Sequence, residues 1–405
     1  MTRYLPPELT DRVVDHLHDD PRALSSCALT SRILLSAARY HQFGTIILNS
    51  DRITLFNALL DKDPSLGYSV SKILLASRFW THLWHPNANE LRIAIERTPA
   101  CRHIEIWHIQ FLENSQVITQ LIAGTKNLQI ESLRIYDVHF FCGFDELPWL
   151  ISSLPYLQDL TLDSICSKDT GEDSSKLWEV HKPPSRLTAL TTGTINENGV
   201  HNICSWLGKA KPSFVLHSYN LEIVDYSSAY FGTQVLTHFG QTISDLSVKV
   251  DCDLNVPYVL DKVGLTVENG SSLRHLHISF HLRDMFVKEN QSLQWITILI
   301  SQISSPIIET ITITIYADEV QFHDLRALDS ECGVRELLLV KFEDMTALNW
   351  EVINDLLSEK FRSLNRLSLK GRGPWDTFKA YIESYYQSIA HLVVLDASDS
   401  ENNVV

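Results

Sequence analysis

Long apolar runs and paired cysteines are both missing from this 405-residue sequence. Without a run of about eighteen apolar residues, or the charged-then-apolar order of a leader peptide, we expect a chain that neither crosses a membrane nor is exported. Its seven cysteines are odd in number and lie far apart, which argues against a disulfide framework or a cysteine-ligated zinc site. We therefore expect buried, reduced thiols and a location in the cytoplasm, the nucleus or both.

Basic residues are outnumbered as well. The chain has 34 lysines and arginines against 49 aspartates and glutamates, for a formal net charge of -15. Such a chain repels a phosphate backbone, and no cluster of basic residues offsets this locally. Nucleic acid is therefore not an expected partner.

Signatures of catalysis and of metal binding are also missing. The Gly-Arg-Gly-Pro stretch at 371–374 lacks the Lys-Ser/Thr ending of a phosphate loop and predicts a turn. The histidines within 82–85, with Cys101, His103 and His108 further on, lack the CxxC or HExxH spacing of a metal site. No GxSxG or kinase motif is present. We predict a protein that is not an enzyme and that binds no metal or cofactor.

What the sequence does contain is an internal repeat of the form apolar-x-x-apolar-x-apolar. The central positions of its copies are Ile73, Ile104, Leu133, Leu160, Leu190, Tyr219, Leu246, Leu276, Ile311, Leu337, Leu367 and Leu392. Eleven steps lead from 73 to 392, so the mean spacing is 29 residues, at the upper end of the range for leucine-rich repeats. Units this short bury their apolar residues only against neighbouring units, which predicts a stacked solenoid.

Helical patterns fill the intervals between these anchors, at 87–98, 198–207, 291–303, 343–357 and 375–386. The pattern thus predicts a strand followed by a helix in each repeat. We expect an α/β leucine-rich-repeat solenoid over 44–395, with a curved parallel sheet and helices on its convex side, and a flexible acidic tail over 396–405. Ordinary βαβ units in a doubly wound α/β domain remain the alternative, although no glycine-rich phosphate turn follows any of the strands.

A different pattern occupies residues 1–43, where three short helices are expected. Leu9 and Val13 share one helical stripe. Asp20 and Ser31 are suited to cap the second and third helices. Three helices of this length bury little surface, so the module must pack on the repeats or on a partner. A helical cap for the exposed end of the solenoid is one interpretation of these residues.

The run LPPELTDRVVDHLHDDPRALSSCALTSRILLSAARYHQF resembles an F-box, particularly the version found in the large F-box families of mushroom-forming fungi. The resemblance rests on its Leu-Pro-x-Glu-Leu opening, its Leu-x-x-Cys-x-Leu-x-Ser-Arg centre and its Ala-Arg-Tyr-His-x-Phe end. It implies that the helices bind the Skp-type adaptor of a cullin ubiquitin ligase and that the C-terminal repeats select the protein to be ubiquitinated.

By position, the resemblance assigns adaptor contacts to Leu5, Pro6, Leu9, Val13, Leu17, Leu24, Cys27, Ser31 and Leu34. Many family members carry tryptophan where this chain has Leu34, which implies the loss of an aromatic anchor. The function implied is that of a substrate-recognition adaptor of a Skp–cullin–F-box ubiquitin ligase, with the repeats holding an unidentified target protein. A leucine-rich-repeat scaffold that binds protein outside ubiquitination is the alternative.

Residues that flank the apolar anchors alternate with them, so period two predicts their side chains on the concave face. Those expected to bind the target are His103, Glu105, Trp107, Arg134, Tyr136, Asp159, Asp163, His275, His277, Arg366 and Lys370. Aromatic and arginine side chains favour protein recognition, because they bury much area at small entropic cost. A merely solvated face is the other interpretation. Five residues after their anchors, Val138, Ile165 and Arg372 replace the Asn or Cys of many leucine-rich repeats, which predicts irregular repeats.

Overall fold

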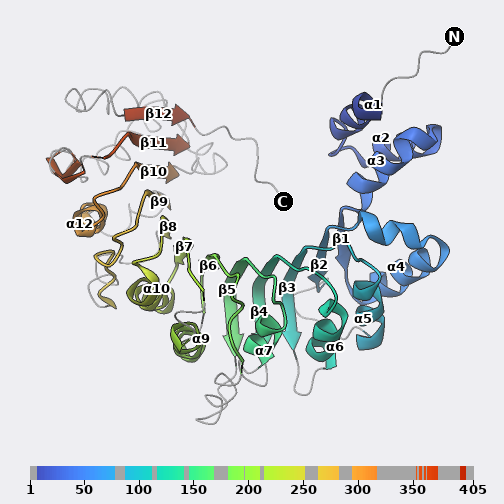
Figure 1. Ribbon diagram of the computed structural model, residues 1–405, viewed down its shortest axis with the longest axis horizontal. Helices are drawn as coiled ribbons and strands as arrows, with labels where there is room; N and C mark the ends of the chain where they lie inside the picture. The colour runs from blue at the N-terminus through green and yellow to red at the C-terminus, as the bar shows by residue number, and fades with distance from the viewer. Residues whose placement is uncertain are drawn as a thin grey trace, which may run out of the picture. The chain divides into compact units, whose positions relative to one another are not determined.

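The structure is a computed structural model that describes residues 7–77, 87–111, 116–140, 146–167, 181–195, 197–209, 214–250, 263–281, 294–316, 353, 355–357, 360–361, 363–372 and 393–397. The chain divides into two compact units, Met1–Leu187 and Thr188–Val405, which we call unit 1 and unit 2. Both alternate strands with helices (Figure 1).

Unit 1 begins with three helices, α1 (Pro7–Asp15), α2 (Pro21–Thr30) and α3 (Arg32–Phe43). Asp20 caps α2, where one side-chain oxygen accepts hydrogen bonds from the backbone N–H groups of Arg22 (2.9 Å) and Ala23 (3.0 Å). Ser31 caps α3 by accepting from the N–H of Ile33 at 3.2 Å. Both expected caps are confirmed, and each satisfies donors that have no partner within their own helix.

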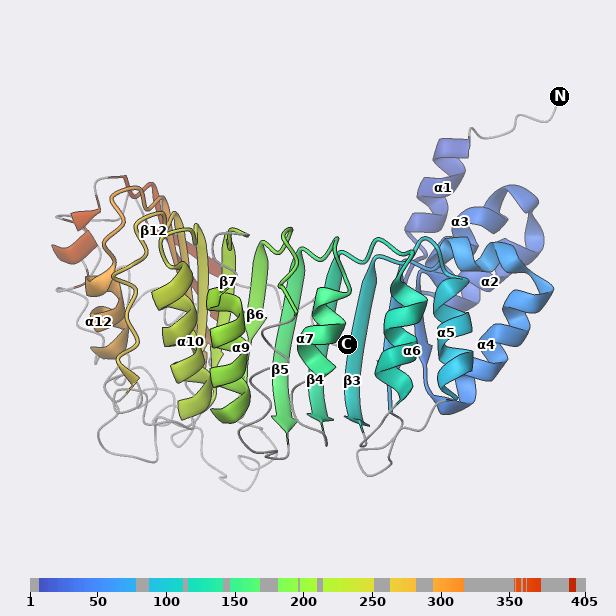
Figure 2. The same ribbon diagram turned by 60° about the horizontal axis from the view of Figure 1, so that its bottom comes forward.

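The rest of unit 1 alternates strands and helices along the chain. Its elements are β1 (Thr45–Leu48), α4 (Ser50–Lys62), the 3-10 helix η1 (Pro64–Ser69), β2 (Lys72–Ala76), α5 (Ala88–Glu96), β3 (His103–Phe111), α6 (Gln116–Thr125), β4 (Ser132–Phe140), α7 (Glu146–Ser152) and β5 (Asp159–Ser167). The strands pair in parallel and in sequence order, from β1 to β5. Figure 2 shows α5, α6 and α7 along one face of these strands.

Unit 2 follows the same plan. Its described elements are β6 (Ala189–Thr192), α9 (Glu197–Lys209), β7 (Ser218–Ile223), α10 (Tyr226–Phe239), β8 (Asp245–Val250), β9 (His275–His281), α12 (Gln294–Gln302), β10 (Thr310–Tyr316), β11 (Arg366–Arg372) and β12 (Val393–Ala397). These strands also pair in parallel and in sequence order, from β6 to β12.

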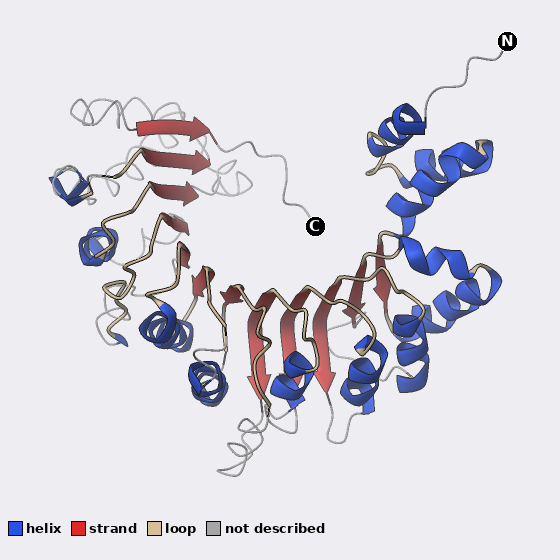
Figure 3. Ribbon diagram, viewed as in Figure 1, coloured by secondary structure: helices blue, strands red, loops and turns tan. Residues whose placement is uncertain are grey.

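The predicted anchors meet one another across the strands. Ile104 of β3 pairs with Ile73 on one side and with Leu133 on the other, and all three side chains are at most 1% exposed. Within each unit the described helices that alternate with the strands lie on one side of them (Figure 3). A parallel sheet in sequence order is compatible with a curved solenoid and differs from a doubly wound domain, where strand order reverses and helices cover both faces.

Two of the predicted anchors do not have the positions expected of them in the sheet. Ile311 of β10 pairs directly with Leu367 of β11, so the strand expected around Leu337, which lies outside the described residues, does not stand between them. Leu367 pairs in turn with Val393, so that residue, and not Leu392, occupies the last anchor position. The residues around Val393 are all apolar, which explains this error. An alternating pattern fits such a run equally well with Leu392 or with Val393 as the anchor.

Other expected segments are only partly described. The helices expected at 87–98, 198–207 and 291–303 are present as α5, α9 and α12. The one expected at 375–386, and most of the one at 343–357, lie outside the described residues. Gly371, expected in a turn, belongs to β11. The strand β12 extends to Ala397, and the remainder of the expected tail, 398–405, lies outside the described residues.

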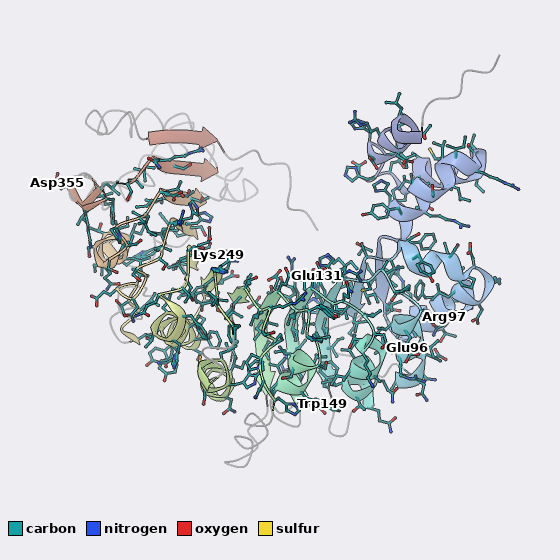
Figure 4. All side chains as sticks on the ribbon, viewed as in Figure 1. Glu96, Arg97, Glu131, Trp149, Lys249 and Asp355 are labelled. Carbon is teal, nitrogen blue, oxygen red and sulfur yellow. The ribbon has the colours of Figure 1, made fainter. Side chains whose placement is uncertain are left out.

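Polar contacts join α4 to α5 in the helix layer of unit 1. Arg97, labelled in Figure 4, lies just after α5 and forms an ion pair with Asp61 of α4 at 2.8 Å. The side-chain amide of Asn57 donates a hydrogen bond to the carbonyl oxygen of Glu90 at 3.0 Å. These contacts join one helix to the next, as backbone pairing joins one strand to the next.

Candidate interaction surfaces

The three N-terminal helices share a very small core. Val14, Leu24 and Ala38, one from each helix, are buried, and partly buried apolar residues pack around them. His41 Nε2 and Asp15 Oδ1 are 2.8 Å apart and tie α3 to α1. A core of this size contributes little burial free energy, so the module depends on further contacts.

Among the described residues, the same helices leave five large apolar side chains exposed. They are Leu9 and Val13 of α1, Leu29 of α2, and Ile33 and Tyr40 of α3, with exposed fractions from 45% to 90%. Leu9 and Val13 lie four residues apart and therefore share a face of α1. A concentration of exposed apolar side chains on so small a module is typical of a protein–protein interaction surface.

The nine residues assigned to adaptor binding divide into groups. Leu9 and Val13 are exposed, Ser31 serves as the cap of α3, and Leu5 and Pro6 lie outside the described residues. The four that pack against the module's own core are Leu17, Leu24, Cys27 and Leu34. The exposed apolar residues of α2 and α3 were not predicted, because a periodic apolar stripe selects residues that face inward.

The strands of unit 1 present a second surface, on the side opposite their buried anchors. Because side chains alternate along a strand, the residues between anchors line this strand face. One row across β2 to β5 consists of Leu74, Glu105, Arg134 and Thr161. The next row consists of Ala76, Trp107, Tyr136 and Asp163.

Charged side chains of alternating sign lie across this face around Glu105. This residue is only 5% exposed. Lys72 Nζ lies 2.9 Å from Glu105 Oε1, and Arg134 Nη1 lies 3.6 Å from the same oxygen. The other arm of Arg134 lies 3.8 Å from Asp159 Oδ2, which also accepts a hydrogen bond from the Ser132 hydroxyl at 3.3 Å. A buried carboxylate needs such cations, since burial alone disfavours its charge.

An aromatic pair lies beside these charges. The rings of Trp107 and Tyr136 pack edge to face, with centroids 5.4 Å apart. Burial raises the pKa of the Tyr136 hydroxyl, and the nearby Arg134 guanidinium acts in the opposite direction. The Nε1 atom of Trp107 is buried without a hydrogen-bond partner among the described residues. Half-buried aromatic rings with polar tips are suited to anchoring a protein partner.

A left-handed residue interrupts each of β3, β4 and β5. His108, Asp137 and Ser164 have φ angles of 55°, 50° and 53°, and they occupy equivalent steps of the three strands. Nδ1 of His108 and Oδ2 of Asp137 are 2.8 Å apart. Each left-handed residue is an extra residue in its strand and shifts the inward–outward alternation of the side chains by one position. As a result, Val138 and Ile165 face the core. We call these three residues the left-handed ladder.

The corresponding strand face of unit 2 carries hydroxyl and imidazole groups. His275 Nδ1 and Thr310 Oγ1 are 2.7 Å apart, and His277 Nε2 and Thr314 Oγ1 are 2.8 Å apart. His277 Nδ1 also lies 3.4 Å from Ser247 Oγ. These contacts join neighbouring strands across the face.

The structure brings seven of the residues expected to bind a target onto the strand face of unit 1. They are His103, Glu105, Trp107, Arg134, Tyr136, Asp159 and Asp163. Four occupy strand-face positions of unit 2, namely His275, His277, Arg366 and Lys370. Arg366 is exposed, and the side chain of Lys370 lies outside the described part of the structure.

The described residues also bear on metal binding and on two of the thiols. No group of three or more His, Cys, Asp or Glu there could hold a metal ion. The Cys101 thiol donates a hydrogen bond to the carbonyl of His103 at 3.4 Å, and burial raises its pKa to about 12. Burial also raises the pKa of Cys204. Such thiols are poor ligands and nucleophiles at neutral pH. The histidines of 82–85 lie outside the described residues.

No protein-family model matches the chain, and no curated protein matches its sequence. No helix among the described residues combines the length and the apolar character that crossing a bilayer requires. What the two surfaces bind must therefore be argued from their own chemistry.

Proposed function

We propose that this chain is the substrate-recognition adaptor of a Skp–cullin–F-box ubiquitin ligase. In this role the three N-terminal helices, as an F-box, bind a Skp-type adaptor. The strands and helices that follow, as leucine-rich repeats, hold a target protein on their strand face. The chain positions the target and leaves catalysis to other subunits.

The observation that carries the proposal is the imbalance of the N-terminal helices between buried and exposed apolar side chains. Three side chains, from Val14, Leu24 and Ala38, form the buried centre. Five large apolar side chains are exposed on the same helices. An adaptor that covers them would supply the burial that the module lacks, which is the arrangement that the F-box resemblance of this segment implies.

The strand face of unit 1 supports the second half of the proposal. Trp107, Tyr136 and Arg134 stand together on it, and these residue types contribute most often to the binding energy of protein interfaces. The paired strands β3 and β4 hold them in place, so little conformational entropy is lost when a partner binds.

Replacement of Leu9 and Val13 by aspartate tests the adaptor contact. We expect Leu9→Asp, Val13→Asp to lose about 3 kcal/mol of binding, on the order of a hundredfold in affinity, because two exposed apolar contacts become buried charges. The measurement is co-elution of the full chain with a purified fungal Skp-type adaptor, followed by titration calorimetry.

Leu55→Asp, Leu59→Asp on α4 is the matched control. Leu55 and Leu59 are also exposed leucines four residues apart on one helix, but they lie outside the N-terminal helices. This variant should bind the adaptor as the unaltered chain does. If the unaltered chain fails to co-elute, the alternative of a binding scaffold unconnected with ubiquitination replaces the proposal.

A further inference from the structure

Four side chains in the middle of the unit 1 strand face lie next to one another on two neighbouring strands. Glu105 and Trp107 belong to β3, and Arg134 and Tyr136 lie beside them in register on β4. The two aromatic rings form one row, with centroids 5.4 Å apart, and the two charged side chains form the adjacent row. We call these four residues the central patch. A ligand that contacts one row therefore lies within reach of the other.

The aromatic row presents mainly ring carbon to a ligand. Trp107 is partly exposed, but its Nε1 atom is buried, so the part of the indole that reaches the surface is carbon. Ala76, the neighbour of Trp107 on β2, has too short a side chain to cover the indole from that side. Tyr136 packs edge to face on the other side. The two rings therefore form an apolar surface that suits a compact, rigid group.

The charged row is electrically balanced. Lys72 Nζ lies 2.9 Å from Glu105 Oε1, and the Arg134 guanidinium lies 3.6 Å from Glu105 and 3.8 Å from Asp159. Two cations thus face two carboxylates. A charged group of a ligand would meet like charge as readily as opposite charge in this row, so the row favours a neutral ligand.

The Arg134 guanidinium can donate hydrogen bonds to such a ligand. Its distances to both carboxylates exceed hydrogen-bond length, and among the described residues it makes no hydrogen bond. The side chain is 44% exposed. A guanidinium carries several N–H donors and no acceptor. A peptide carbonyl oxygen is a neutral group that can accept from them.

We infer that the central patch binds a proline-rich segment of a partner protein in the polyproline II conformation. Pyrrolidine rings are compact, rigid and apolar, and proline-rich segments dock on aromatic side chains. A polyproline II segment has no internal hydrogen bonds, so its carbonyl oxygens can accept from Arg134. The conformation forms before binding, which keeps the entropic cost low on a surface that offers few contacts.

Two separate arguments support this inference. Taking the partner as the protein to be ubiquitinated rests on the proposed function. The chemistry of the bound segment rests on the central patch itself, because apolar rings, balanced charges and available N–H donors together match a neutral, rigid segment that is rich in carbonyl groups.

Peptide binding to the full-length chain tests the inference. The probes are labelled peptides of about nine residues, longer than the distance from β1 to β5. The first alternates proline with alanine, the second has leucine in place of every proline, and two more carry glutamate or lysine in place of the central proline. We expect fluorescence anisotropy to show about tenfold tighter binding of the proline peptide than of each of the others. A leucine or charged peptide that binds as tightly as the proline peptide would contradict the inference.

A tryptophan variant tests the aromatic row. Trp107→Leu keeps an apolar side chain and removes the ring, and it should weaken binding of the proline peptide about tenfold. Trp149→Leu makes the same change at a tryptophan of α7, in the helix layer, that is 36% exposed (Figure 4). This control variant should bind the peptide as the unaltered chain does.

An arginine variant tests the charged row with a smaller change to the fold. Arg134→Lys keeps the positive charge and loses the planar group of donors, so it should weaken binding of the proline peptide about fivefold. Arg366→Lys, at an exposed arginine on the strand face of unit 2, is its control and should leave the affinity unchanged. Circular dichroism checks that every variant is folded. An unchanged affinity in a folded Trp107→Leu or Arg134→Lys variant would overturn the inference.

Adaptor co-elution of the same protein preparations separates this result from the proposed function. If the adaptor binds and the proline peptide does not, the inference fails alone. If the proline peptide binds with the expected pattern and the adaptor does not, the central patch is a binding site and the link to ubiquitination fails.

Discussion

Cys101 shows how position alone determines the chemistry of a residue. Its thiol lies at the start of the second apolar triad, fully buried, and burial raises its pKa from 9.0 to about 12. The folded state therefore holds the proton more tightly than the unfolded state does. Stability from this group is fully present below about pH 9 and is lost as pH rises from there toward 12.

The pH dependence of stability should reveal this thiol. Above about pH 9 the free energy of unfolding is expected to fall, with Cys101 contributing up to about 1.4 kcal/mol per pH unit. Urea unfolding at a series of pH values should show a shallower fall for Cys101→Ala than for the unaltered chain. Ile104→Val, a core change without a titrating group, should lower stability equally at every pH. Parallel curves for Cys101→Ala and the unaltered chain would contradict the assignment.

Residue-level prediction from the sequence succeeded where local chemistry decides the outcome. Asp20 and Ser31 cap their helices as expected, because a cap depends on a few neighbouring backbone groups. The near-burial of Glu105 was not predicted, since it depends on Lys72 and Arg134 arriving from neighbouring strands. Leu29, at 90% exposure, was missed for a similar reason, because exposure is set by the packing of three helices.

At the scale of the strand, the left-handed ladder is the main departure from a regular repeat. A non-glycine residue with φ near 50° carries a steric cost of about 1–2 kcal/mol. In β3 and β4 the contact between His108 and Asp137 offsets part of this cost. The sequence predicted irregular repeats from apolar residues such as Val138, and the added ladder residue explains why they are apolar. The ladder itself was not predicted, because His and Asp are only enriched in this conformation and Ser is not, so the residue types at the three positions do not single it out.

Glycine substitution tests the strain in the ladder. Ser164→Gly should raise the free energy of unfolding by about 0.5–1 kcal/mol, because glycine adopts positive φ without the clash of a Cβ atom. The measurement is chemical denaturation of the full chain. Ser132→Gly, in the extended part of β4, is the control and should lower stability by at least that amount, because it also removes the hydroxyl that donates to Asp159. A loss of stability in Ser164→Gly would show that its side chain matters more than its backbone.

For the molecule as a whole, the 29-residue spacing was the decisive signal, and it predicted which strands are neighbours. Ile104 does meet Ile73 and Leu133. The spacing failed between Ile311 and Leu367, an interval of 56 residues, close to two repeats. Counting by period placed a strand there, whereas the sheet passes directly from β10 to β11. A repeat period gives the usual spacing between neighbouring strands, but it does not exclude a single pair of neighbouring strands that lie much further apart in the sequence.

Stacked units predict that damage to one repeat stays near it. Leu133→Ala removes a fully buried anchor of β4 and should cost about 2–5 kcal/mol. Each repeat packs on its immediate neighbours, so amide hydrogen exchange should rise in β3, β4 and β5 more than in β1. Hydrogen-exchange mass spectrometry resolves these strands. A uniform rise across unit 1 would indicate one cooperative core instead of stacked repeats.

The alternation of side chains along the strands has a consequence for how such a protein can diverge. Positions 73, 104, 133 and 160 are buried in the core, while positions 74, 105, 134 and 161 lie on the opposite face of the strands. The two sets interleave in the chain but face opposite ways. Single substitutions at strand-face positions can therefore change what the surface binds, while the buried residues that determine the fold stay the same.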